Sequence, residues 1–229
     1  MSVATYIIAL LLSGCVAEAV FIVLEHRRQM LSALLLKGAA SLLFVLAGLF
    51  ASSLSADLTY AKWIVLGLML GAVGDVCLNL RFLLTGRSKA AFMVGIGSFL
   101  LGHVAYLIAL IARAPGAMLY ALPAAAILSF FLLRFVLSCV EVSGVIKIIG
   151  IVYLCVVFLM AVFAVTLFFL EPQAGRALFA LGGLLFAASD VLLVLNQFGR
   201  HPYPAFRAMN LSLYYIGQVC ICLTIVFLR

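Results

Sequence analysis

The chain alternates between long apolar runs and short polar segments, and eight such runs follow one another along its length. About 20 apolar residues are enough for a helix that crosses a bilayer. By that measure the runs predict spans at 3–24, 38–54, 63–80, 91–112, 117–137, 148–170, 177–198 and 208–228. The connections are too short for a soluble domain. We therefore expect an all-α polytopic membrane protein, with residues 1–229 forming one integral membrane domain.

The composition agrees with a bilayer as the solvent. Of the 229 residues, 68% are hydrophobic and 9% are charged, whereas a soluble domain carries about 25% charged residues. The formal net charge of +7 does not predict nucleic-acid binding, because the basic residues stand between apolar runs and form no patch. The six cysteines show neither a metal-site spacing nor a disulfide framework, so we interpret them as small apolar residues.

The distribution of positive charge predicts the orientation in the membrane. The odd-numbered loops hold ten basic residues: Arg27, Arg28, Lys37, Arg81, Arg87, Lys89, Arg134, Lys147, Arg200 and Arg207. The even-numbered loops and the C-terminus hold four: Lys62, Arg113, Arg176 and Arg229. Because loops rich in Lys and Arg stay in the cytoplasm, we expect both termini on the extracytoplasmic side. The compact loops and the lack of trafficking signals favour a bacterial cytoplasmic membrane.

Two pairs of short motifs recur at one spacing and indicate an internal duplication. They are Gly74-Asp75-Val76 with Ser189-Asp190-Val191, and Gly102-His103-Val104 with Gly217-Gln218-Val219. Both pairs are offset by 115 residues. This predicts two four-helix halves, approximately 1–115 and 116–229. Since four spans begin and end on the same side, the halves would be parallel repeats related by an axis near the membrane normal.

Asp75 and Asp190 are the strongest candidates for a functional site. A charged side chain at the centre of a membrane helix costs about 2.5–3.5 kcal/mol, so its presence needs a reason. The expected spans place the two aspartates roughly 9–14 Å from the cytoplasmic helix ends, at 1.5 Å per residue. Glu18 in the first span lies at a similar depth. Three carboxyl groups at one level predict a polar cavity that opens towards the cytoplasm.

Other polar residues are placed to support these carboxyl groups. Gly67, Gly71 and Asn79 share a helix face with Asp75, which permits close helix contact or a ligand. The remaining candidates are Lys37, His103, Tyr106, Tyr214, Tyr215 and Gln218. Structural alternatives stay open for all of them. The carboxyl, histidine and glutamine side chains could bond neighbouring helices, Lys37 could extend its ammonium to the interface, and Asn79 could cap its helix.

The sequence argues against several other chemistries. Two of the three histidines, His26 and His201, are expected in loops, so a buried three-histidine zinc site is not predicted. No Gly-x-Ser-x-Gly elbow and no phosphate-binding glycine loop appear in the sequence. Carboxylate chemistry without an evident cofactor or metal remains.

Four stretches of the chain resemble the lysoplasmalogenase (YhhN-like) family of membrane hydrolases. They are Gly74-Asp75-Val76-Cys77-Leu78, Phe99-Leu100-Leu101-Gly102-His103-Val104-Ala105-Tyr106, Phe186-Ala187-Ala188-Ser189-Asp190 and Tyr214-Tyr215-Ile216-Gly217-Gln218. The eight-span layout also agrees, so the resemblance covers nearly the whole chain. One departure is Lys37-Gly38, where the family often has Lys-Pro; it affects helix entry more than chemistry.

The resemblance implies a function. It implies hydrolysis of the vinyl ether bond of lysoplasmalogens, which are lysophospholipids within the bilayer, to a fatty aldehyde and a glycerophospho-alcohol. It also implies that Asp75 and Asp190 are the catalytic pair and that no metal is needed. A vinyl ether is hydrolysed by protonation of its β-carbon followed by capture of water, which needs one acid and one base. Two carboxyl groups in a low-dielectric site can supply both, provided that they approach each other across the bundle.

Two other classes of function compete with a hydrolase. A small proton-coupled transporter also combines parallel repeats with intramembrane carboxylates, although no span is broken by Gly-Pro at matching places in both halves. A lipid-binding or structural membrane protein without turnover is the third possibility. Neither the head group preference nor the oligomeric state follows from the sequence.

Overall fold

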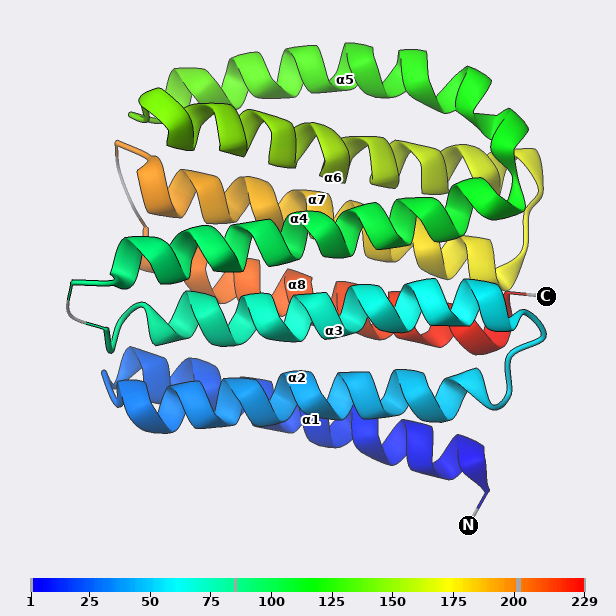
Figure 1. Cartoon of the computed structure of the whole chain (residues 1–229), viewed down its shortest axis with the longest axis horizontal. Coiled ribbons are helices and arrows are strands. Elements are labelled where there is room, and N and C mark those ends of the chain that lie inside the picture. Colours follow the sequence, from blue (N-terminus) through cyan, green and yellow to red (C-terminus); the bar gives the residue numbers. More distant parts are fainter. Residues whose placement is uncertain (1, 85, 201–202, 229) are drawn as a thin grey trace. The chain divides into compact units, whose positions relative to one another are not determined.

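The computed structural model describes residues 2–84, 86–200 and 203–228. Two residues used in the sequence interpretation, His201 and Arg229, lie outside this part. The described residues form one short 3₁₀ turn, Pro115–Ala117, and eight α-helices (Figure 1). The helices are α1 (Val3–His26), α2 (Met30–Ser52), α3 (Leu58–Leu80), α4 (Ser88–Arg113), α5 (Met118–Cys139), α6 (Gly144–Leu170), α7 (Ala174–Phe198) and α8 (Pro204–Phe227).

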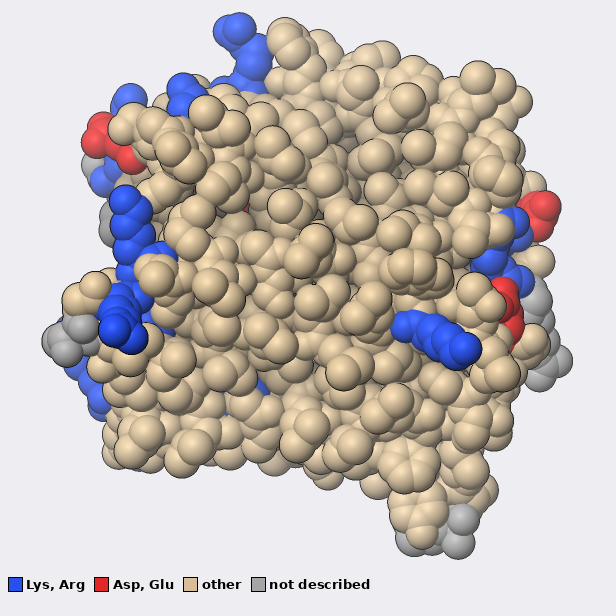
Figure 2. Space-filling view, in the orientation of Figure 1, with Lys and Arg blue, Asp and Glu red and all other residues tan. Residues whose placement is uncertain are grey.

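All eight helices are long and apolar enough to cross a membrane. In the space-filling view the charged side chains gather near helix ends, and the surface along the middles of the helices is almost free of them (Figure 2). Large exposed residues such as Leu12, Leu119 and Phe169 contribute to this apolar surface. The chain is therefore an integral multi-pass membrane protein, as the sequence predicts.

Local sequence signals explain where several helices begin. The Ser2 side chain caps α1 by accepting a hydrogen bond from the Thr5 N–H at 3.2 Å. Asp57 caps α3 in the same way, accepting from the Tyr60 N–H at 3.0 Å. Such caps satisfy N–H groups that have no partner inside the helix. Pro204 is the first residue of α8, a position where proline's missing N–H costs nothing.

The predicted spans match the helices in number and order, but every predicted start except those of α1 and α5 is late. The largest error is at α2, which begins at Met30 and not at residue 38. A charged residue normally marks the edge of an apolar run, so the sequence predicts that the connection before the second span ends at Lys37. Lys37 instead lies inside α2 and is 1% exposed. A lysine can sit there because carboxylates on two other helices contact its ammonium, as described below.

The chain divides into two compact units, which we describe separately. Unit 1 comprises Met1–Ala109 with Ile225–Arg229, and unit 2 comprises Leu110–Thr224. In unit 1, α2 packs against both α1 and α3. In unit 2, α6 packs against both α5 and α7. Each unit thus has a second helix that lies between two others.

A close approach of two glycines joins the third and fourth helices of each unit. In unit 1, a Cβ atom at Gly102 in α4 would lie 3.2 Å from the Gly67 carbonyl oxygen in α3. In unit 2, a Cβ atom at Gly217 in α8 would lie 3.2 Å from the Gly182 carbonyl oxygen in α7. Both glycines of unit 2 follow those of unit 1 by 115 residues, the offset of the sequence motifs. The two units therefore share this helix crossing, which is the pattern expected from a duplication.

Candidate functional site

Unit 1 contains a buried cluster of charged residues contributed by its first three helices. Glu18 comes from α1, Lys37 and Ser41 from α2, and Asp75 from α3. These four residues are between 1% and 5% exposed. Charges buried in this way are costly unless they pair with one another. The contacts within the cluster show how these buried charges are paired.

Lys37 bridges the two carboxyl groups. Its Nζ lies 3.3 Å from Glu18 Oε1 and 3.3 Å from Asp75 Oδ1. The same Nζ lies 4.9 Å from the centre of the Phe21 ring, which is within the range of a cation–π contact. The Ser41 hydroxyl donates to the other Asp75 oxygen, Oδ2, at 2.6 Å. Both oxygens of Asp75 are therefore engaged by donors from α2.

The spacing along α2 makes this arrangement possible. Lys37 and Ser41 are four residues apart, so they lie on the same face of the helix. The structure rejects the alternative in which Lys37 extends to the membrane interface, because its ammonium is enclosed between α1 and α3. Sequence interpretation missed Ser41. Its position one turn after an intramembrane lysine was the signal that could have identified it.

Three further candidates lie near Asp75 in sequence or on the next helix: Asn79 is on α3 itself, and His103 and Tyr106 are on α4. The Asn79 amide donates to the Asp75 backbone carbonyl at 2.9 Å. A Cβ atom at Gly67 would lie 2.1 Å from the Tyr106 ring, so this ring occupies the space above the glycine. The His103 and Tyr106 rings meet edge to face, with centroids 6.2 Å apart. The small-residue face of α3 is thus used at Gly67 for contact with α4.

Asp190 in unit 2 is as buried as Asp75 but has different neighbours. It is 5% exposed, and its carboxyl is hydrogen-bonded to the Tyr153 hydroxyl from α6. The adjacent Ser189 accepts hydrogen bonds from the Asn210 amide at its carbonyl and at its hydroxyl, both at 2.8 Å. Tyr153 and Asn210 were not among the predicted site residues. No local motif marks them, because each contact joins two different helices.

The aromatic candidates of α8 form a second polar contact in unit 2. The Gln218 amide donates to the Tyr214 hydroxyl one turn earlier, at 2.9 Å. The Tyr214 ring packs edge to face against Phe186 of α7 and against Tyr215, with centroids 5.3 Å and 5.2 Å apart. Gln218 and Tyr214 therefore bond to each other within α8, and Tyr214 also links α8 to α7.

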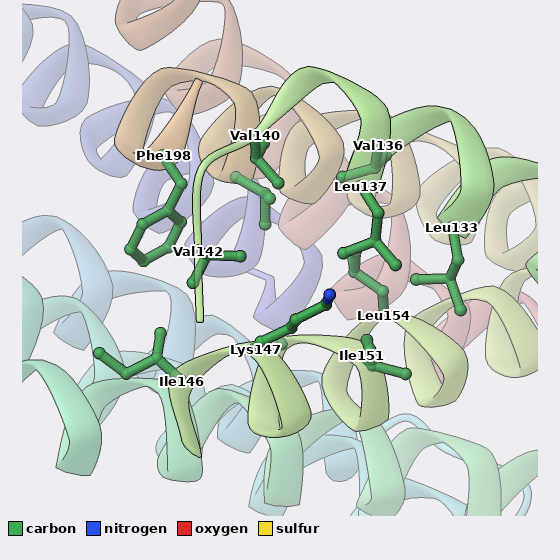
Figure 3. Close-up of a pocket in the computed structure, with 12 residues that line it drawn as sticks. Leu133, Val136, Leu137, Val140, Val142, Ile146, Lys147, Ile151, Leu154 and Phe198 are labelled. Carbon is green, nitrogen blue, oxygen red and sulfur yellow. The ribbon is translucent and has the colours of Figure 1, made fainter. Parts of the chain in front are cut away.

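Two pockets of unit 2 are almost wholly apolar. A cavity of about 30 Å³ lies among α5, α6 and α7, and the Lys147 side chain extends across it towards Leu137 (Figure 3). A larger hollow of about 350 Å³ lies between α5 and α6, with Ser129 its only hydroxyl. Neither lining contains a carboxyl group. These spaces suit hydrocarbon and offer no acid–base chemistry.

Within the described residues, no group of three or more His, Cys, Asp or Glu side chains is arranged to hold a metal ion. The site residues that can move a proton are the two buried aspartates and the groups that contact them. Asp75 can act as a carboxylate anion next to a developing positive charge. Asp190 can exchange a proton within a hydrogen bond to a neutral hydroxyl.

Comparison with known protein families gives one match, which agrees with the resemblance found in the sequence. Residues 32–225 match the YhhN family, the family of lysoplasmalogenases. This stretch contains both aspartates, Lys37 and Ser41. Neither the curated proteins nor the solved structures gave a match.

Proposed function

Because this chain belongs to the YhhN family, we propose that it is a lysoplasmalogenase-like membrane hydrolase. Its substrate would be a lysophospholipid whose chain is joined to glycerol by a vinyl ether. The products would be a fatty aldehyde and a glycerophospho-alcohol. The observation that carries the proposal beyond family membership is the buried Lys37–Asp75–Ser41 cluster. It provides a fixed, charged carboxyl group at membrane depth, where such a group is costly unless it is used or paired.

The chemistry needs two carboxyl groups in opposite protonation states. One donates a proton to the β-carbon of the vinyl ether, which leaves an oxocarbenium ion. The other accepts a proton from water as the water oxygen bonds to that cation. The resulting hemiacetal collapses to the aldehyde and the alcohol. Asp75 and Asp190 are the candidates for these roles, and an anionic carboxylate also stabilises the cationic intermediate.

The depth of Asp75 suits the ether bond of a lipid. Asp75 lies five residues before Leu80, the last residue of α3, which is roughly 7–8 Å along the helix. The ether oxygen of a lysophospholipid lies just below its glycerol, so a head group at the helix end would bring the bond towards this level. Two basic residues near this level, Lys37 and Arg81, could hold the head group. Lys37 is engaged by two carboxylates, which leaves Arg81 at the end of α3 as the better candidate.

We also propose that the chain lies in a bacterial cytoplasmic membrane with both termini outside. The ten-to-four distribution of basic residues supports this orientation. Lys37 contributes nothing to it, since its charge is buried and paired. Without Lys37 the odd-numbered loops still hold more than twice as many basic residues as the others.

Aldehyde release from defined lipids tests the proposal. Purified protein would receive lysoplasmenyl-ethanolamine, lysoplasmenyl-choline and the saturated alkyl-ether analogue of each. We expect aldehyde from the vinyl ethers alone, because the β-carbon of an alkyl ether is saturated and has no C=C electron pair that could accept a proton. Asp75→Asn and Asp190→Asn should each lower the rate by about 100-fold or more. Asp57→Asn is the matched control, because Asn caps a helix as well as Asp does.

Two outcomes would contradict the proposal. If the parent protein releases no aldehyde from either head group, it is not a lysoplasmalogenase. Solute flux into sealed proteoliposomes, lost in Asp75→Asn and Asp190→Asn but not in Asp57→Asn, would show that the buried carboxyl groups serve a proton-coupled transporter. Intramembrane carboxylates occur in both classes, so the same variants decide between them.

A further inference from the structure

The seam between α5 and α6 in unit 2 contains two neighbouring apolar spaces. The hollow of about 350 Å³ and the cavity of about 30 Å³ share Leu133 in their linings. Along α5 the hollow extends to Leu122, and the cavity extends in the other direction to Val140. At 1.5 Å per residue these ends are roughly 27 Å apart. We call the two spaces together the α5–α6 groove.

The sequence of α5 explains why the groove is open. The lining includes the small side chains of Ala125, Ala126 and Ser129. Pro123 also lies inside α5, and a proline inside a helix lacks the N–H of one backbone hydrogen bond and kinks the helix. α5 is the least buried of the eight membrane-length helices. An apolar space beside it gains packing contacts when hydrocarbon fills it, whereas water would find few polar partners there.

The α6 side of the groove is one stripe of the helix with a cation at its end. Its residues Lys147, Ile151, Cys155 and Leu159 follow one another at intervals of four, so they share a helix face. In Figure 3 the Lys147 side chain extends across the cavity towards Leu137. The groove therefore combines an apolar lining with a positive charge where α6 begins.

The Lys147 ammonium is available to an anion. Lys147 is exposed, and within the described residues it has no carboxyl partner. Glu141, the nearest acidic residue in the sequence, pairs instead with Arg200 at 3.2 Å. A lysine at the end of a membrane helix lays its alkyl stem on apolar surface and keeps its ammonium at the level of the lipid head groups. A lipid phosphate at that level is complementary to this charge.

We propose that the α5–α6 groove binds one anionic phospholipid, with its phosphate at Lys147 and an acyl chain along the seam. From Val140 to Ser129 the groove covers roughly 16 Å, about half of a hydrocarbon core of about 30 Å, which matches the chain of a lipid in one leaflet. Charge favours a lipid over a second copy of this protein, because the chain has 7 acidic residues against 14 basic ones. The site contains neither buried aspartate, so it goes beyond the proposed function.

Native mass spectrometry of the full-length protein tests the head group. Phosphatidylglycerol and phosphatidylcholine with identical acyl chains would compete for the purified protein. We expect one retained phosphatidylglycerol and a preference for it of about 5-fold. Lys147→Gln should abolish the preference, and Lys147→Arg should keep it. Lys89→Gln is the matched control, because Lys89 is also exposed near the start of a helix but lies outside the groove. An unchanged preference in Lys147→Gln would overturn the proposal.

A groove-filling variant tests the acyl chain. Ala126 is exposed and lines the hollow, so Ala126→Phe should fill it and lower the retention of both lipids by about 10-fold. Ala124→Phe is the control, because Ala124 is exposed on the same helix but does not line the hollow. If Ala126→Phe does not fold, Cys155→Phe fills the hollow from α6. Equal retention in the filled and control variants would overturn the site. A dimer without bound lipid that Ala126→Phe dissociates would assign the groove to a second copy.

Thermal unfolding gives an independent readout, because a lipid that binds only the folded protein raises its Tm. Added phosphatidylglycerol should raise the Tm of the parent protein, Lys89→Gln and Ala124→Phe by a few degrees. Lys147→Gln and Ala126→Phe should lose most of this shift. An equal shift in all five proteins would mean that the lipid acts on the whole apolar surface, which would overturn a specific site. Neither measurement uses aldehyde release, so failure here leaves the proposed function untouched.

Discussion

Asp75 and Asp190 occupy equivalent places in their units but have different surroundings. Each lies on the third helix of its unit, after a glycine that approaches a glycine of the fourth helix. In unit 1 the second helix contributes an ammonium and a serine hydroxyl to the aspartate. In unit 2 the second helix contributes a tyrosine hydroxyl. The crossing of the helices is common to both units, whereas the charge around the carboxyl group is not.

A duplicated fold can thus hold its two equivalent carboxyl groups in different surroundings. Two carboxyl groups in identical surroundings would favour the same protonation state, and a reaction that needs one acid and one base would lack one of them. Lys37 and Ser41 on α2 surround one aspartate and Tyr153 on α6 contacts the other, so the two environments differ. The contacts that join the helices are unaffected, because the glycine crossings involve other residues. The polar contacts of the two carboxyl groups and the packing of the helices thus depend on different positions.

The largest expected effect tests whether the two aspartates work together. If they are the acid and the base of one reaction, replacing either aspartate already stops the turnover that needs both. The double variant Asp75→Asn/Asp190→Asn should therefore be no slower than the worse single variant, each being reduced by about 100-fold or more. Rates of aldehyde release in a double-mutant cycle measure this. Multiplying losses would mean that the two aspartates act independently.

The next effect concerns the helix crossing that the units share. A methyl group at Gly67 would meet the Tyr106 ring at 2.1 Å, and at Gly182 it would meet the Ile221 side chain at 2.8 Å. Gly67→Ala and Gly182→Ala should each destabilise the protein by about 1–3 kcal/mol through overpacking. Thermal unfolding in detergent measures the loss. Gly97→Ala is the control, because nothing lies within 4 Å of its added Cβ. Destabilisation by only one of the two variants would show that the two helix crossings differ in how well they accommodate an added methyl group.

The smallest expected effects concern two hydroxyl groups, those of Ser41 and Tyr153, which contact the two aspartates. Ser41→Ala removes a hydrogen bond to a charged carboxylate and should lower kcat by about 10-fold, since such bonds contribute about 1.5–3 kcal/mol. Tyr153→Phe removes the hydroxyl that bonds to the Asp190 carboxyl group, and we expect a decrease of only a few-fold. Ser98→Ala, which removes a hydroxyl that donates to the Leu70 carbonyl, is the control. A larger loss in Tyr153→Phe than in Ser41→Ala would contradict this order of effects.

The sequence by itself determined the class of protein and the two residues of greatest interest. Eight apolar runs of membrane length predict eight spanning helices, because backbone groups in lipid must be satisfied within the helix. Asp75 and Asp190 stand out because charge is rare and costly in such runs. Their 115-residue spacing is a property of the chain and requires no structure. The resemblance to the YhhN family, confirmed over residues 32–225, also rests on short local motifs.

Only the tertiary structure decided what surrounds each aspartate. Lys37 appeared in sequence to be the end of a loop, and the structure places it inside α2 between Glu18 and Asp75. Tyr153 carried no signal of its own, since a single hydroxyl in an apolar run has many possible partners, and the signal at Ser41 depends on knowing that Lys37 lies inside the helix. A buried charge is compensated by groups on neighbouring helices, and the pairing depends on how the helices pack. Hydrophobicity is recorded residue by residue along the chain, whereas electrostatic partners are set by distances between segments that the sequence separates.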